Sequence, residues 1–89
     1  MDEFQAQLEM GLARIAFKEK RWADAERIYG EVFQKYANTS SAPEARYWQV
    51  AAHFQGTHDH AIFASGAIEL QERWPESVWA KKALPWLNE

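Results

Sequence analysis

The stretch LARIAFKEKRWADAERIYGEVFQKY, from Leu12 to Tyr36, decides the fold of this chain. Its apolar residues recur every three or four positions on both sides of the charged segment 18–21, which predicts two helices joined by a tight turn. Because the connection is so short, the two helices must be antiparallel. Ala25 is a small residue where the second helix has to press against the first. The stretch therefore predicts a helical hairpin.

The first helix of the hairpin is expected to begin at Asp2, which can cap it with Gln5 in the reciprocal position. Large apolar residues recur at helical spacing along it, and smaller ones form a flatter strip beside them. We expect the large residues to be the packing face. That face is Phe4, Leu8, Leu12 and Ile15, and the flatter strip is Ala13 and Ala16. The face predicted for the second helix is Trp22, Ala25, Ile28, Tyr29, Val32, Phe33 and Tyr36.

A third helix is predicted after the polar connection 37–41. Ser41 and Glu44 are spaced as a capping box, and Pro43 lies in the first turn, where its missing N–H is harmless. Apolar groups surround much of this helix, so we expect it to be central in the fold.

Two more helices are expected further along. Thr57 or Asp59 can cap a fourth helix, which ends before Pro75, and Ser77 can start a short fifth one. Pro85 should stop or kink that helix, so that the tryptophan and leucine after it fold back as a lid. Those two residues are Trp86 and Leu87.

An internal repeat supports this division of the chain. Moving segment 35–39 forward by 38 residues places it on segment 73–77, and the same shift brings Trp48 onto Trp86. In both segments a cation is followed by an aromatic residue, by a break between helices and by a polar residue that can cap the next helix. A period of this length is typical of helical solenoids, in which each helical pair buries its face against the next.

The first hairpin resembles the tetratricopeptide repeat. The pattern of large apolar, small and aromatic residues around a turn is similar to the series Leu12, Ala13, Phe17, Lys20, Trp22, Ala25, Tyr29 and Val32. The resemblance implies an all-α, right-handed superhelix within a single domain, 1–89. Its parts would be two antiparallel hairpins, 3–36 and 42–74, and a C-terminal capping helix, 77–87. It also implies a protein-binding scaffold or adapter.

A second resemblance concerns the parent protein. Segments 3–12, 42–48 and 74–83 are similar to the helical tail that follows a thioredoxin-like domain in some bacterial proteins. The aromatic-Pro-x-Ser and Ala-x-x-Ala pieces are also similar to repeats in envelope proteins of the Tol–Pal and outer-membrane assembly systems. The first comparison implies an accessory domain of a longer protein. The chain has no Cys-x-x-Cys motif, so no redox activity comes with it.

Composition excludes several function classes. The 89 residues contain no cysteine, which excludes disulfides and cysteine-ligated metal sites. A formal net charge of −3 gives no reason to expect nucleic acid or anionic lipid as a partner. No apolar run approaches the roughly 20 residues needed to cross a bilayer, and no leader pattern is visible. We therefore expect no membrane insertion and a cytoplasmic chain as given. A periplasmic location stays open if the chain is part of an envelope protein.

No catalytic residue, metal site or cofactor is predicted. His53, His58 and His60, with Asp59, are the only residues that invite a metal interpretation, and a stable site needs three or four convergent ligands. Turn and surface histidines are the favoured interpretation. Three spaced acids look like a solvated face rather than paired catalytic acids; they are Glu69, Glu72 and Glu76. We expect no enzyme activity.

Binding of a protein or peptide is the remaining function. In stacked hairpins the first helix of each pair lines a concave groove. The candidate groove residues are Met10, Arg14, Phe17, Lys18, Tyr47, Ala51, Phe54 and Lys81. An aromatic and basic groove suits a peptide that carries acidic and apolar groups. Two alternatives stay open: Trp48 and Phe54 as core residues with Arg14 and Lys18 as solvated charges, or a homodimer formed through exposed Trp79, Trp86 and Leu87.

Overall fold

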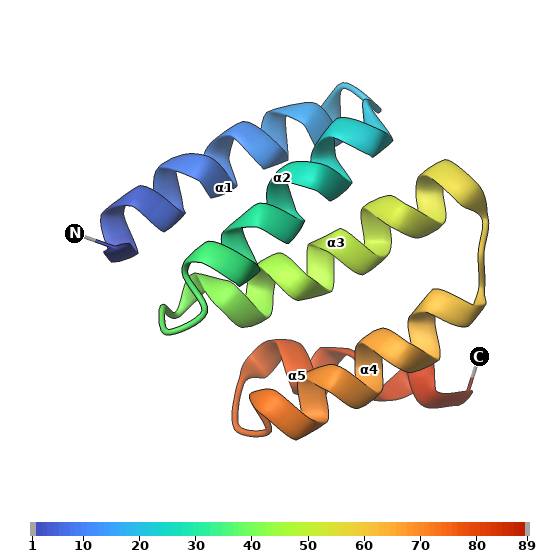
Figure 1. Ribbon diagram of the computed structural model, residues 1–89. Helices are drawn as coiled ribbons and strands as arrows, with labels where there is room; N and C mark the ends of the chain where they lie inside the picture. Colours follow the sequence, from blue (N-terminus) through green and yellow to red (C-terminus); the bar gives the residue numbers. More distant parts are fainter. Residues whose placement is uncertain (1, 89) are drawn as a thin grey trace.

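The computed structural model describes residues 2–88 and is entirely helical in architecture over that range (Figure 1). The elements in chain order are α1 (Asp2–Lys18), α2 (Trp22–Lys35), α3 (Ser41–Thr57), α4 (Ala61–Arg73), α5 (Val78–Lys82) and a closing 3-10 helix, η1 (Leu84–Asn88). The predicted all-α fold is confirmed. None of the helices within residues 2–88 has the length and apolar character that crossing a membrane requires.

The first four helices lie side by side and alternate in direction, with α1 at one edge of the array (Figure 1). Helix α2 packs between α1 and α3, while α5 and η1 pack against α4. Helix α3 contacts α1, α2, α4 and α5, so its predicted central position is confirmed. The first helix of each pair also contacts the next one: α1 touches α3, and α3 touches α5.

The packing face predicted for α1 is wrong. Phe4, Leu8, Leu12 and Ile15 are 58%, 52%, 59% and 51% exposed. The buried face is instead Ala6, Met10, Ala13 and Ala16. Methyl groups on α1 allow its backbone to approach α2 closely. The large side chains of α2 that share the same buried cluster are Tyr29, Val32 and Phe33.

Helix α2 uses the face predicted from its spacing. Ala25 is fully buried in the cluster that also holds the alanines of α1. Gly30 of α2 lies against α3, because a Cβ on it would meet the side-chain amide of Gln49 at 2.6 Å. The two helices that flank α2 are therefore both held at short range by small residues.

The predicted capping box at the start of α3 is wrong. Ser41 is already helical, and the carboxylate of Glu44 accepts a hydrogen bond from Trp48 Nε1 at 3.3 Å instead of reaching back to the helix end. The preceding residue, Ser40, donates through its backbone N–H and its hydroxyl to Glu3 of α1, at 3.0 and 2.9 Å. A contact with another helix has replaced the local cap, which spacing alone does not reveal.

The cap predicted for the fifth helix is confirmed, because the hydroxyl of Ser77 at the N-cap of α5 accepts a hydrogen bond from the N–H of Ala80 at 3.0 Å. At α4 the N-cap residue is His60, which makes no side-chain cap, and Asp59, one residue earlier, accepts a hydrogen bond from the N–H of Ala61 at 3.1 Å. The cap predicted for α1 differs, since Asp2 belongs to the helix itself and Met1 lies outside the described residues.

Helices α3 and α4 meet through one apolar and one charged contact. Val50 is fully buried against Gly66, where a Cβ would lie 2.5 Å from Val50 Cγ2. Arg46 Nε lies 2.7 Å from Glu69 Oε1, and both side chains are mostly buried. This contact is an ion pair without hydrogen-bond alignment, because the Nε–H of Arg46 has no hydrogen-bond partner among the residues that the structure describes.

The C-terminal segment folds back as predicted. The ring of Trp86 in η1 stacks on Tyr47 at a centroid distance of 4.6 Å and lies 5.2 Å from Phe63. Leu87, predicted to close with it, stays 45% exposed. Trp86 therefore packs the chain end against α3 and α4.

Candidate functional site

Aromatic side chains from every helix of the fold form one continuous series of ring contacts. The series joins α1 to α3 through Phe17 and Trp48, whose centroids are 5.5 Å apart, and α3 to α5 through Trp48 and Trp79, at 6.1 Å. We call this set the aromatic band. Its members are Phe17, Trp22, Tyr47, Trp48, Phe54, Phe63, Trp79 and Trp86, and each is half-buried.

The rings of the aromatic band meet in edge-to-face, tilted and stacked pairs, and the edge-to-face pairs join Phe17, Trp22, Tyr47 and Trp48. Phe17 approaches Trp22 at 80° and Trp48 at 73°, and Tyr47 approaches Trp48 at 85°. Such pairs contribute about 0.5–1.5 kcal/mol beyond their buried area. The band thus holds the first helices of the hairpins together while leaving part of each ring at the surface.

A groove lies between α1 and α3, with one residue of α2 in its floor. It consists of two adjoining hollows, which share Arg14 and Glu44. The hollow nearer the aromatic band has a volume of about 260 Å³ and is mainly apolar; it is lined by Arg14, Phe17, Lys18, Tyr29, Glu44 and Trp48. The other, of about 340 Å³, is mainly polar and is lined by Gln7, Met10, Arg14, Ser40, Ser41 and Glu44. We call the two together the α1–α3 groove.

Charge is divided between the two walls of the α1–α3 groove. Arg14 and Lys18 project from α1, are exposed, and make no ion pair within residues 2–88. Glu44 stands on the opposite wall and is bound to Trp48 Nε1. Burial raises the pKa of the Tyr29 phenol, an effect that Arg14 opposes and Glu44 reinforces. Tyr29 therefore remains a neutral hydrogen-bond donor at physiological pH.

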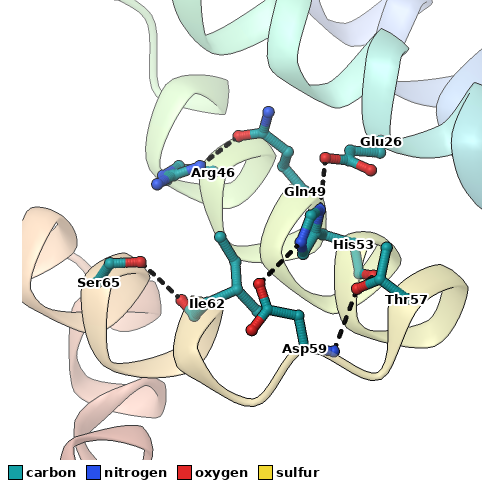
Figure 2. Close-up of polar contacts among 8 residues, drawn as sticks. All are labelled: Glu26, Arg46, Gln49, His53, Thr57, Asp59, Ile62 and Ser65. Atoms are coloured by element: carbon teal, nitrogen blue, oxygen red, sulfur yellow. Dashed lines mark hydrogen bonds and ion pairs between the residues drawn. The ribbon is translucent and has the colours of Figure 1, made fainter.

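The histidines considered for a metal site are separated by their contacts. Figure 2 shows His53 between two carboxylates, with Nδ1 2.8 Å from Glu26 and Nε2 3.4 Å from Asp59. The hydrogen bond to Glu26 is the main cause that raises the pKa of His53; burial opposes it, and Asp59 adds to it. His58 and His60 lie instead against the ring of Phe54. Within residues 2–88 no group of three or more His, Cys, Asp or Glu side chains is placed to hold a metal ion.

The structure brings together half of the predicted groove residues. Met10, Arg14, Phe17 and Lys18 all line the α1–α3 groove, although Met10 is only 3% exposed. The other four lie elsewhere. Tyr47 is stacked under Trp86, Phe54 packs against His60 and Phe63, Ala51 is half-buried on α3, and Lys81 is exposed on α5.

Four groove residues have other roles in the prediction from sequence. Tyr29 belongs to the predicted packing face of the second helix, Ser41 and Glu44 to a helix cap, and Trp48 to the core. All four line the groove because α2 and α3 turn them toward α1. The spacing of Trp48 four residues after Glu44 was the available signal, since it puts an acceptor within reach of the indole N–H.

The surface expected for homodimerisation is smaller than predicted. Trp79 and Trp86 are half-buried and pack on Tyr47, so they do not form an exposed patch. Among the apolar residues at this end, Val78, Leu84 and Leu87 are the exposed ones.

Comparisons with protein-family models, with curated proteins and with solved structures gave no match.

Proposed function

We propose that this chain is a protein-interaction module of the tetratricopeptide type that binds a peptide segment in the α1–α3 groove. One observation carries the proposal: two cations that make no ion pair within residues 2–88 stand beside an apolar floor. The resemblance to helical tails of bacterial thioredoxin-like proteins favours an accessory domain of a longer protein. Binding, rather than chemistry, is the activity proposed.

The groove suits a particular kind of peptide. Phe17, Tyr29 and Trp48 offer apolar surface for one large side chain, which would act as the anchor of the complex. The hollow, at about 260 Å³, is smaller than the roughly 300–1,000 Å³ typical of ligand pockets, so it accepts a side chain rather than a whole small molecule.

The charges of the groove set the orientation of the peptide. A carboxylate beside the anchor would face Arg14 and Lys18, whereas a carboxylate on the other side would be repelled by Glu44. The ligand class is therefore a peptide with an acidic residue next to a large apolar one. Backbone N–H groups of such a peptide would find an acceptor in Glu44.

Selection from a random peptide library displayed on phage would test the proposal. We expect enriched peptides to share an acidic residue next to a large apolar residue. The double variant Arg14→Glu/Lys18→Glu should then bind them at least about tenfold more weakly, a loss near 1.4 kcal/mol, by calorimetry. The matched control Arg27→Glu/Lys35→Glu changes the net charge equally on α2, outside the groove, and should bind as the native chain does.

A separate variant tests the contribution of the apolar lining of the groove to peptide binding. Phe17→Ala removes an apolar wall, and we expect it to weaken the same peptides while circular dichroism stays helical. Intrinsic tryptophan fluorescence should change on peptide binding, since Trp48 lines the hollow. Enrichment of no sequence class, or equal binding by the native chain and the charge-reversed double variant, would contradict the proposal.

A further inference from the structure

His53 of α3 joins two carboxylates that belong to different parts of the fold (Figure 2). Its Nδ1 lies 2.8 Å from Glu26 of α2, and its Nε2 lies 3.4 Å from Asp59 in segment 58–60, which connects α3 to α4. Within residues 2–88, helices α1, α4 and α5 place no carboxylate within ion-pair distance of this ring. Glu26 and Asp59 are also the charged groups that act on the pKa of His53. His53 therefore ties segment 58–60 to α2.

Asp59 is the residue through which His53 holds the start of α4. One carboxylate oxygen of Asp59 faces His53, and the other accepts a hydrogen bond from the N–H of Ala61 at 3.1 Å. The other restraints here are weak: the backbone hydrogen bond from Ile62 to Asp59 is 3.3 Å long, and the N-cap residue of α4 makes no side-chain cap. His58 has a φ of 57°, a left-handed conformation that is unfavourable for a residue with a Cβ. Segment 58–60 thus depends on Asp59 to stay in place.

The protonation state of His53 decides how many carboxylates it can bind. A protonated imidazole has two N–H donors, whereas a neutral imidazole has one donor and one lone pair. When the ring is neutral, one of the two carboxylates must face the lone pair. Glu26 is the closer partner and its side chain is 35% exposed, against 50% for Asp59. The proton should therefore stay on Nδ1, which leaves Asp59 without a donor on His53.

This difference makes the connection between α3 and α4 sensitive to pH. The hydrogen bond to Glu26 is the largest cause that raises the pKa of His53 above its usual value of 6.5. Both carboxylates are therefore bound below pH 6.5, and the change follows as the pH rises through the folded-state value. We propose that His53 is a latch: on losing a proton it keeps Glu26 and releases Asp59, and segment 58–60 then opens together with the first turn of α4.

The opening of the latch would change the surface around Phe54. His60 and Phe63 pack on the ring of Phe54 at centroid distances of 4.9 and 4.8 Å, and both belong to the part that opens. The second half of α4 stays against α3, because Gly66 meets Val50 there. No part of the latch lines the α1–α3 groove, so this proposal does not rest on peptide binding.

Nuclear magnetic resonance of the native chain from about pH 5 to pH 9 tests the latch. The amide protection factors of Ile62 and Phe63 should fall about two- to fivefold, the effect of losing one part-exposed ion pair. The midpoint should match that of the His53 ring signals, and the protection factor of Leu70 should not change. The ¹⁵N shifts of the ring should show the neutral form protonated on Nδ1. A neutral ring protonated on Nε2 would overturn the proposal, because Glu26 would then be the carboxylate that is released.

Variants separate the latch from a general effect of pH. His53→Gln and Asp59→Asn should each remove the pH-dependent loss of protection, and Asp59→Asn keeps an oxygen for the N–H of Ala61. The control His58→Asn/His60→Asn removes the two other histidines, and asparagine tolerates the left-handed conformation at position 58. This control should lose protection as the native chain does. A loss that persists in His53→Gln, or that is absent from the control or from a native chain in which His53 titrates, would overturn the proposal.

Discussion

Replacing Gly66 by alanine should destabilise the fold, although alanine is the better helix former. The added Cβ would lie 2.5 Å from Cγ2 of Val50 and 3.5 Å from its Cβ and Cγ1. Val50 is fully buried and β-branched, and a β-branched residue in a helix has one strongly preferred rotamer. The side chain therefore cannot swing aside, and α4 must move away from α3.

The expected magnitude follows from two opposing effects. Alanine gains about 0.5–1 kcal/mol of helix propensity over glycine. Overpacking a well-filled core costs about 1–3 kcal/mol. We expect a net loss of about 1–2 kcal/mol for Gly66→Ala. At Gly11 only the propensity gain applies, because its Cβ would meet no atom within 4 Å. Gly11→Ala should therefore stabilise the monomer by about 0.5–1 kcal/mol.

Urea unfolding followed by far-UV circular dichroism measures both changes. The two variants carry the same chemical substitution and should move the midpoint in opposite directions. Adding Val50→Ala to Gly66→Ala should cost less than Val50→Ala costs alone, since the smaller residue removes the clash. If Gly66→Ala raised the midpoint as Gly11→Ala does, the contact between α3 and α4 described above would be wrong.

Three further predictions concern the packing and charge of the core. Ala25→Leu should overpack the hairpin and lower the free energy of unfolding by about 1–3 kcal/mol, and an unchanged melting temperature would contradict the register of α2. Because the pKa of His53 is raised in the folded chain, its two carboxylate contacts stabilise the fold fully below pH 6.5, and this stabilisation is lost as the pH rises through the pKa of His53 in the folded state. The melting temperature of His53→Gln should therefore differ less between mildly acidic and mildly alkaline buffer than that of the native chain. Glu69→Gln, which breaks the mostly buried pair with Arg46, should cost about 1–3 kcal/mol in urea unfolding, whereas Glu31→Gln in the exposed pair with Arg27 should cost under about 0.5 kcal/mol.

The sequence identified helices and turns more reliably than the faces of the helices. Ser77 caps α5 as predicted, and Asp59 binds the first N–H of α4 from one residue before its N-cap, because such side chains act within a few residues of their own position. On α1, hydrophobicity selected Phe4 and Leu8, yet Ala6 and Ala13 face α2. The distance between two helices depends on the small residues where they meet, and that depends on the partner helix.

The candidate groove shows the same difference between residues that one helix groups and residues that depend on how several helices pack. Arg14, Phe17 and Lys18 share one helix, so their spacing was sufficient to group them. Tyr29 and Trp48 come from two other helices, and their place in the groove depends on how α2 and α3 are rotated. The sequence pattern predicts that both residues lie in apolar surroundings, but it does not predict which neighbouring residues they contact.

The buried alanines of α1, which are Ala6, Ala13 and Ala16, affect how this helix separates from α2. Three of the four buried residues of α1 contribute only a methyl group, so the side chains of this helix lose little buried surface when it detaches, and the apolar surface that it uncovers belongs mainly to α2. Polar contacts supply much of the rest, among them the 2.7 Å hydrogen bond from Tyr36 to Glu9. Amide hydrogens of α1 should accordingly exchange with solvent sooner than those of α2 and α3, through a local opening that leaves the other helices folded.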